Sequence, residues 1–148
     1  MDTGSSQDHR NDPAVVRRLL ERPGRWAVVG LSANPDRVAY GIAAYLQKMG
    51  MEIVPVHPKA DTVHGAPGYR TLAELAAAKD EPIDVVDVFV NSELAGDVVD
   101  QAIAVGAKAV WLQLGVIDQA AAARAAAAGL DVVMDTCPAI EAPRLGLA

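Results

Sequence analysis

Five short apolar segments alternate with helical segments along the chain, and this alternation restricts the fold more than any other feature. The apolar segments are residues 26–29, 52–57, 84–90, 108–113 and 130–134. Helices are predicted between them, and three of these end at a glycine, namely Gly50, Gly106 and Gly129. Strands and helices that alternate at intervals of roughly 25–30 residues form βαβ units with parallel strands. We therefore expect an α/β fold: a single Rossmann-like, doubly wound domain with a five-stranded parallel sheet.

Both ends of the chain extend this pattern. Asp12 and Pro13 are typical of a helix N-terminus and predict a helix over residues 14–21, while residues 138–145 predict a short last helix. Residues 1–11 are polar, and we expect a disordered tail there, followed by one domain over residues 12–148. With 148 residues, 51% of them apolar, the chain can bury a full core.

The composition argues against several classes of function. The formal net charge is −6 and no basic block is present, which argues against a nucleic-acid-binding surface. No apolar run approaches the length of a membrane span. The single cysteine, Cys137, has no partner in the chain for a disulfide, which fits a reducing compartment. We therefore expect a cytoplasmic protein that binds a small molecule, without nucleic-acid or membrane partners.

The turn after the first strand has the composition of an anion site. Gly30 ends the strand, and Ser32 and Asp36 lie among turn-forming residues before a helix predicted over residues 38–49. The N–H groups and positive dipole end of such a helix face the ligand in folds of this class. Ser32 adds a hydroxyl group and Arg37 a guanidinium group, so we expect a phosphate-bearing ligand. The alternative is an ordinary βα turn that binds nothing.

The end of the second strand carries His57, Pro58 and Lys59. The dinucleotide fingerprint G-x-G-x-x-G, with an acidic residue about 20 residues further on for a ribose hydroxyl, is absent. A cation in place of that acid favours a phosphorylated ribose, as in NADP with its 2′-phosphate or coenzyme A (CoA) with its 3′-phosphate. The alternative is that Lys59 is a solvated loop charge and that His57 only caps the strand.

Polar residues also follow the other strands. Asn91 and Ser92, after the third strand, have an alternative role as helix caps, whereas Gln113, after the fourth, has none. Cys137 follows the fifth strand and is predicted to be buried and unreactive, with a mixed disulfide to the CoA thiol as the alternative.

The sequence contains no metal-ligand spacing, nucleophile motif or P-loop, so a non-catalytic role is favoured and enzymatic activity stays open.

Several short motifs occur in a fixed order over residues 13–146. They are Trp26-Ala-Val-Val-Gly-Leu-Ser32, Asn34-Pro-Asp-Arg37, Ile53-Val-Pro-Val-His-Pro58, Val86-Asp-Val-Phe-Val90, Val110-Trp-Leu-Gln113, and Cys137 with Glu141, Arg144 and Leu145. As a set they resemble the small, stand-alone CoA-binding proteins, which are similar to the CoA-binding Rossmann domain of the succinyl-CoA synthetase α subunit. The resemblance implies that CoA is held by the first loop and by the turns after the second and third strands.

The resemblance also assigns roles to residues. It implies that the CoA phosphates meet Gly30, Leu31, Ser32 and Arg37, that the adenosine phosphate lies near Pro58 and Lys59, and that the adenine and pantetheine lie near Phe89, Val90 and Asn91. His57 stands where the family commonly has asparagine. The second domain of the synthetase, with its phosphorylated histidine, has no counterpart here, so ligase activity is not carried over.

We therefore interpret the chain as a non-catalytic protein that binds CoA or an acyl-CoA. Two alternatives stay open: a small NADP-dependent reductase, and a regulatory or scaffold subunit with a vestigial site. The expected ligand contacts are Gly30, Leu31, Ser32, Arg37, His57, Pro58, Lys59, Phe89, Val90, Asn91 and Gln113.

Overall fold

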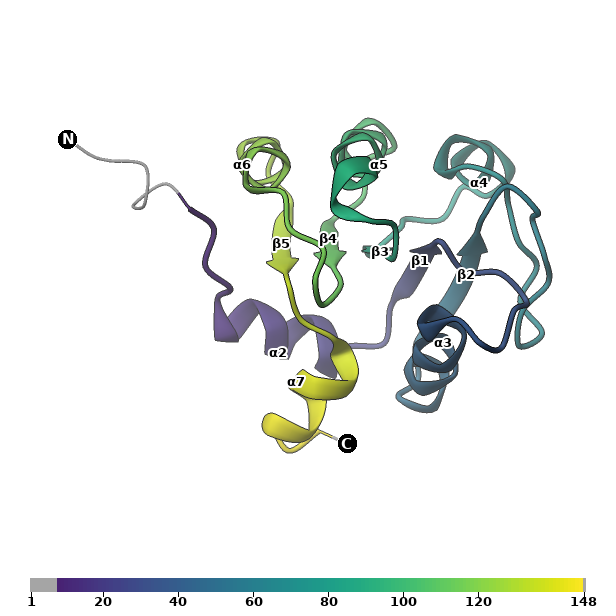
Figure 1. Cartoon of the computed structure of the whole chain (residues 1–148), viewed down its shortest axis with the longest axis horizontal. Coiled ribbons are helices and arrows are strands. Elements are labelled where there is room, and N and C mark those ends of the chain that lie inside the picture. The colour runs from purple at the N-terminus through teal and green to yellow at the C-terminus, as the bar shows by residue number, and fades with distance from the viewer. Residues whose placement is uncertain (1–7, 148) are drawn as a thin grey trace.

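The centre of the fold is a five-stranded sheet (Figure 1). The computed structural model describes residues 8–147. The strand order is β2-β1-β3-β4-β5, and every neighbouring pair is parallel. The strands are β1 Arg25–Val29, β2 Glu52–Val56, β3 Val85–Val88, β4 Ala109–Leu112 and β5 Asp131–Met134. Such uninterrupted runs of valine and other apolar residues are typical of parallel strands that are covered on both faces.

Helices cover both faces of this sheet in the part of the chain that is described (Figure 1). One face carries α2 Pro13–Glu21, α3 Val38–Lys48 and α7 Pro138–Arg144, and the other carries α4 Leu72–Ala78, α5 Ser92–Ala104 and α6 Gln119–Ala127. This arrangement confirms the predicted doubly wound, Rossmann-like domain. None of the helices described is long and apolar enough to cross a lipid bilayer.

The order of the strands creates a topological switch point at β1. This strand pairs with β2 on one side and with β3 on the other, and Val29 is aligned with both Val56 and Val88. The helix after β1, α3, covers one face of the sheet, and the helix after β3, α5, covers the other. A crevice therefore opens at the carboxyl ends of these two strands, which is where this fold class binds its ligands.

The two apolar layers of the core follow from the alternation of side chains along each strand. Trp26 and Val28 of β1 face the layer under α3 and α7, whereas Ala27 faces the layer under α5. Trp26 and Trp111 pack with their ring centroids 5.6 Å apart, and the indole N–H of Trp111 donates to the carbonyl of Thr136 at 3.0 Å. The packed indoles hold β1 and β4 in position on one side of the switch point.

Three strands end earlier than the apolar pattern predicted. The sequence extended them to His57, Val90 and Gln113, but β2, β3 and β4 end at Val56, Val88 and Leu112. Phe89 and Gln113 each donate a last hydrogen bond, to the carbonyls of Val29 and Val88, before the chain leaves the sheet, and His57 pairs with Tyr69 of the returning loop instead of with a strand. Phe89 and Val90 consequently belong to a loop, where their side chains are half-buried instead of enclosed.

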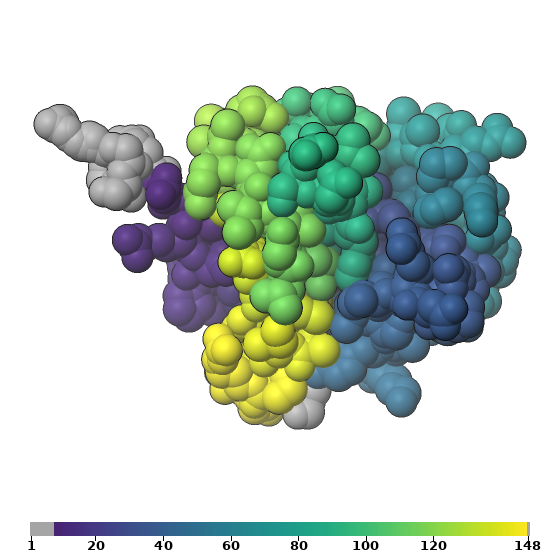
Figure 2. Space-filling model, viewed as in Figure 1, coloured from purple at the N-terminus to yellow at the C-terminus, as the bar shows by residue number. Residues whose placement is uncertain are grey.

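The part of the expected tail that the structure describes, residues 8–11, lies along the edge strand β5. The side-chain amide of Asn11 donates to the carbonyl of Met134 and its oxygen accepts the Met134 N–H, both at 2.9 Å. Arg18 of α2 forms an ion pair with Asp131 of the same strand. On the surface, α7 lies between α2 and α3 (Figure 2). Residues 1–7, which were predicted to be disordered, lie outside the described residues.

Candidate functional site

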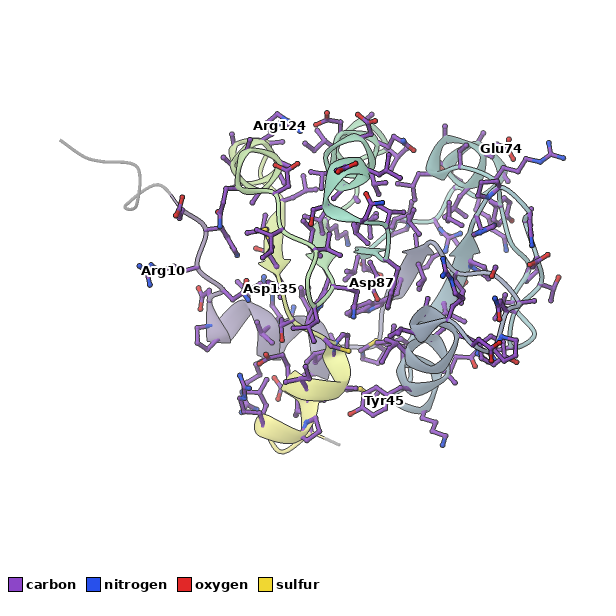
Figure 3. All side chains as sticks on the ribbon, in the orientation of Figure 1. Arg10, Tyr45, Glu74, Asp87, Arg124 and Asp135 are labelled. Atoms are coloured by element: carbon purple, nitrogen blue, oxygen red, sulfur yellow. The ribbon has the colours of Figure 1, made fainter. Side chains whose placement is uncertain are left out.

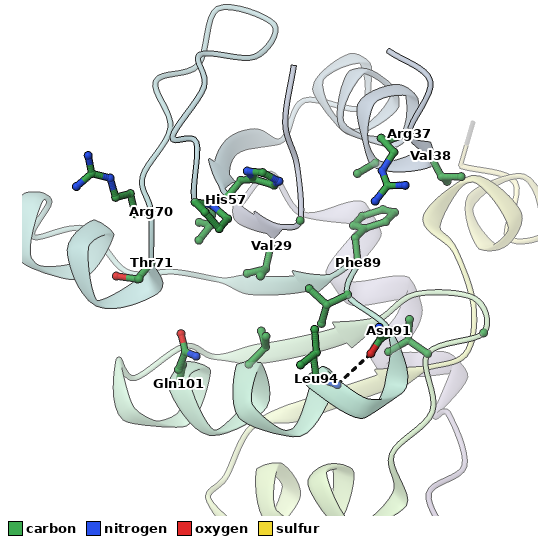
Figure 4. A pocket seen from close by; sticks show the side chains of 18 of the residues that line it. Val29, Arg37, Val38, His57, Arg70, Thr71, Phe89, Asn91, Leu94 and Gln101 are labelled. Atoms are coloured by element: carbon green, nitrogen blue, oxygen red, sulfur yellow. Dashed lines mark hydrogen bonds between the residues drawn. The ribbon is translucent and has the colours of Figure 1, made fainter. Parts of the chain in front are cut away.

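A pocket of about 790 Å³ opens at the carboxyl ends of β1, β2 and β3, at the switch point (Figure 4). Its walls are the loops after these strands, the first residues of α3, the loop before α4, one side of α5 and the loop after β4. It contains seven of the eleven residues predicted from the sequence, namely Gly30, Arg37, His57, Pro58, Phe89, Val90 and Asn91. Leu31, Ser32, Lys59 and Gln113 do not line it.

Gly30 allows β1 and the end of β3 to approach each other at the floor of the pocket. Its φ is +105°, and its N–H donates to the carbonyl of Val56 at 2.8 Å. A Cβ atom at this position would lie 3.1 Å from the Cβ of Phe89. Glycine is therefore required for both the backbone conformation and the space.

The N-terminus of α3 faces this pocket without a side-chain cap. Its N-cap residue, Arg37, has an extended backbone and makes no capping hydrogen bond, in contrast to Asn91, whose side-chain oxygen accepts the N–H of Leu94 at 3.2 Å in α5. The N–H groups of Val38 and Ala39 have no acceptor among the described residues. Free N–H groups, the positive end of the helix dipole and a guanidinium group together favour an anion at this point.

The loop before α3 is held by its own polar groups. The Ser32 hydroxyl accepts the N–H of Asn34 at 3.3 Å, and the Asn34 side chain accepts the N–H of Asp36 at 2.9 Å. The N–H of Ala33 donates to the Asp61 carboxylate at 3.0 Å. Ser32 is therefore buried in a turn, and Leu31 packs fully into the core. Their side chains shape the loop rather than line the pocket.

The turn after β2 turns His57 into the pocket and leaves Lys59 outside it. The imidazole Nδ1 accepts the N–H of Lys59 at 3.1 Å, which leaves the proton of a neutral ring on Nε2. The Lys59 side chain is exposed and does not reach the lining. Arg70, which the sequence reasoning missed, stands at the rim instead (Figure 4).

Arg70 reaches this position because the long loop after β2 folds back along the same strand. Tyr69 donates its N–H to the carbonyl of Pro55 and accepts the N–H of His57, both at 2.9 Å. The turn also requires Gly68, since a Cβ there would lie 2.3 Å from the carbonyl oxygen of Asp61. In the sequence, Arg70 stands out only as a basic residue directly before Thr71, the N-cap residue of α4. A basic residue at such a position does not by itself indicate a binding site.

The far wall consists of the β3 end and α5. Phe89, Val90 and Asn91 line the pocket as predicted, and Leu94, Val98 and Gln101 of α5 continue the wall. These three share one helix face by their spacing, which the sequence analysis did not assign to the site. Gln113 is only 4% exposed and lies beyond this wall, so its side chain belongs to the protein interior.

The charge of the lining differs from that of the whole chain. The chain has a formal net charge of −6, yet the described lining contains Arg37, Arg70 and His57 against one acid, Asp36. Within residues 8–147 neither arginine forms a salt bridge. A basic pocket on an acidic protein selects for anionic ligands. In the described residues no group of three or more His, Cys, Asp or Glu could hold a metal ion.

Two further residues with reactive or ionisable side chains lie in the interior. Cys137 is 7% exposed, lies at the N-cap position of α7 without a side-chain capping hydrogen bond and does not line the pocket, so the burial predicted for it is confirmed. Asp87, which is labelled on β3 in Figure 3, is aligned in the sheet register with Val28 and Trp111. Neither of its carboxyl oxygens has a partner in the described structure, and burial raises the pKa of this carboxyl group well above its ordinary value.

Comparison with known proteins identifies the family. Residues 24–143, which include every strand and the whole pocket lining, match the model of the CoA binding domain. The chain belongs to this family. A relative from Bacillus subtilis (strain 168), the uncharacterized protein YneT, is 36% identical over 124 residues, which are 84% of this chain and 89% of YneT.

Solved structures agree with this assignment. A hypothetical protein from Pyrococcus horikoshii OT3 has a TM-score of 0.82 and 33% identity, with 98% of this chain and 99% of that chain covered. A larger protein also contains the fold: the dinucleotide-forming acetyl-coenzyme A synthetase 1 of Ca. Korarchaeum cryptofilum, in complex with phosphate and ADP. It gives a TM-score of 0.69 at 23% identity, and the match covers 81% of this chain but 27% of the synthetase. The resemblance inferred from the motifs is thereby confirmed.

Proposed function

We propose that this member of the family binds CoA or an acyl-CoA in the pocket at the switch point and has no catalytic activity of its own. The observation that carries the proposal is the uncapped N-terminus of α3, which faces the pocket together with the unpaired guanidinium group of Arg37. Family membership supports the choice of CoA among the phosphate-bearing ligands that such a site accepts. The proposal places the protein in the cytoplasm, where its single cysteine stays reduced.

In this proposal the pyrophosphate of CoA lies at the first turn of α3, against the N–H groups of Val38 and Ala39 and the Arg37 side chain. The adenosine 3′-phosphate lies on the β2 side, where the Nε2–H of His57 and the guanidinium group of Arg70 supply donors and Arg70 supplies a positive charge. Bound CoA supplies a thiol that carries acyl groups, and the residues of this chain bind and orient it. Among the described lining residues no nucleophile is hydrogen-bonded to a base, which supports a binding role.

Thermal unfolding with different ligands tests the choice of CoA. A ligand present at 100 times its dissociation constant adds about 2.7 kcal/mol to the free energy of unfolding. We expect CoA to raise the Tm, and NAD and NADP to leave it unchanged. A shift with NADP alone would favour the small reductase, because a ribose 2′-phosphate needs the same cations. No shift with any ligand would favour a scaffold with a vestigial site.

A substitution then tests the location. Arg37→Ala removes no capping or ion-pair contact of the folded protein, so it should fold normally and bind CoA at least about five-fold more weakly, as expected for one charge-assisted hydrogen bond. Arg17→Ala is the matched control, since Arg17 is an exposed arginine on α2 that pairs with Glu21. If calorimetry gives the two variants equal affinities for CoA, Arg37 does not contact the ligand.

A further inference from the structure

Three large apolar side chains are exposed at the mouth of the pocket. Val38 is 71% exposed at the start of α3, Leu94 is 52% exposed on α5, and Leu114 is 62% exposed after β4. Among the described residues five large apolar side chains are exposed, and the three most exposed of them all line the same pocket. Single exposed apolar residues are common, but a group of them around one polar pocket indicates an apolar contact.

The loop that carries Leu114 is held in place by hydrogen bonds. The N–H of Gly115 donates to the Asp135 carboxylate at 2.8 Å, and the N–H of Ile117 donates to the Ser92 hydroxyl at 3.0 Å. The N–H of Val116 donates to the carbonyl of Gln113 at 2.8 Å. Because the loop is tied to both β5 and α5, Leu114 is kept exposed beside the pocket.

The two basic residues of the lining on the β2 side and the exposed leucine after β4 lie on opposite sides of β1 and of the α3 N-terminus that follows it. His57 and Arg70 belong to the loop after β2, whereas Leu114 belongs to the loop after β4, and the strand order places β2 and β4 on opposite sides of β1. In CoA the pyrophosphate joins a charged adenosine phosphate to a pantetheine arm that bears no charge. If the pyrophosphate lies at α3 and the 3′-phosphate at His57 and Arg70, the arm and its thiol point toward the apolar side.

We propose that this apolar rim receives the acyl group of a CoA thioester, so that the site prefers thioesters of apolar acids to free CoA. The inference rests on the proposed function and names the ligand class for the same pocket. A terminal carboxylate on the acyl group would be placed against the apolar side chains of Val38, Leu94 and Leu114 instead of in water, and this desolvation of a charge is unfavourable. CoA thioesters of dicarboxylic acids should therefore bind with no higher affinity than free CoA.

Calorimetry with CoA, butyryl-CoA and succinyl-CoA tests this preference. Burial of a methylene group contributes up to about four-fold in affinity, and a half-exposed rim supplies a fraction of that. We expect butyryl-CoA to bind about five-fold more tightly than CoA, and succinyl-CoA to bind no more tightly than CoA. Leu114→Ser and Leu94→Ser should each reduce the butyryl preference, and Ile140→Ser should keep it, because Ile140 is an exposed apolar residue of α7 outside the pocket.

The outcomes separate this inference from the function on which it rests. If CoA binds but butyryl-CoA binds equally well, the apolar rim is not an acyl site, while the CoA-binding function stands. If the butyryl preference survives both serine substitutions, the acyl group lies elsewhere and the inference is wrong. If no CoA species binds at all, the proposed function fails and the inference fails with it.

Discussion

The backbone of Gly30 lies directly against the side chain of Phe89, so that a Cβ atom on Gly30 would be 3.1 Å from the Cβ of Phe89. The two residues follow β1 and β3, the strands that flank the switch point. This contact closes the floor of the pocket, and it leaves no room for a side chain between the first loop and the end of β3.

Gly30→Ala should therefore lower the free energy of unfolding by about 2–4 kcal/mol, since it combines an unfavourable positive φ with overpacking. Gly50→Ala is the matched control, because Gly50 also has a positive φ, +95°, but a Cβ atom there would meet nothing within 4 Å beyond its own chain neighbours. Urea unfolding of both variants separates the two costs. An equal loss in the two variants would show that the contact with Phe89 contributes nothing.

The strands and the sheet could be predicted because the residues that determine each strand and the turn after it are neighbours in the sequence. The run from Trp26 to Val29 is apolar without alternation, and Gly30 and the cap residues mark the turn after it. Right-handed crossovers then restrict the topology. The ends of the strands were predicted less well, since the hydrogen bonding that ends β3 at Val88 depends on neighbouring strands and not on the apolar character of Phe89.

The site could be predicted only where the chain turns directly after a strand. Gly30, His57 and Asn91 follow strands and line the pocket. Arg70 does not, because the return of residues 57–70 along β2 depends on Tyr69 pairing with Pro55, a contact that leaves no periodic signal. Lys59 was the nearest cation in the sequence, yet a tight turn directs it away.

Asp87 makes stability depend on pH in a direction opposite to that of most carboxylates. Its pKa is raised in the folded state above the ordinary value of 3.8, so the folded protein holds a proton that the unfolded chain releases. The contribution of Asp87 to the free energy of unfolding is therefore at its most favourable below about pH 4. It falls by about 1.4 kcal/mol per pH unit as the pH rises toward the raised pKa.

Asp87→Asn removes this titration. The free energy of unfolding of the variant, relative to that of the natural chain, should therefore increase as the pH rises above about 4, as measured by urea unfolding at several pH values. Asp80→Asn, at an exposed position, is the control and should show no such trend. A difference between Asp87→Asn and the natural chain that stays constant with pH would mean that Asp87 is ionised in the folded protein.

Asn11 protects the edge strand β5 by pairing with the backbone of Met134 through two hydrogen bonds. Asn11→Ala should lower the free energy of unfolding by about 1–3 kcal/mol and speed the hydrogen exchange of the Met134 amide. Asn11→Asp keeps the acceptor for this amide but loses the donor to the Met134 carbonyl, so it should preserve more of the protection. Arg10→Ala, an exposed neighbour, is the control. Unchanged exchange in Asn11→Ala would show that the segment does not hold the edge.

Two cations, Arg70 and Lys59, follow β2 and could bind the phosphate on the ribose of CoA. The sequence pointed to Lys59, whereas Arg70 lines the pocket and Lys59 does not. Dephospho-CoA lacks the 3′-phosphate, and we expect it to bind about five- to ten-fold more weakly than CoA, as for one ion pair in a partly exposed groove. This difference should shrink as the salt concentration rises, because exposed charges are screened.

Arg70→Ala should largely remove the difference in affinity between CoA and dephospho-CoA, and Lys59→Ala should keep most of it. The comparison of two ligands across two variants isolates the pairwise interaction from any general change in the loop. If Lys59→Ala removes the difference in affinity between the two ligands and Arg70→Ala keeps it, the Lys59 side chain moves to bind the phosphate. Arg70 is then an exposed charge at the rim without a contact to the ligand. If the natural chain does not distinguish the ligands, neither residue recognises a ribose phosphate.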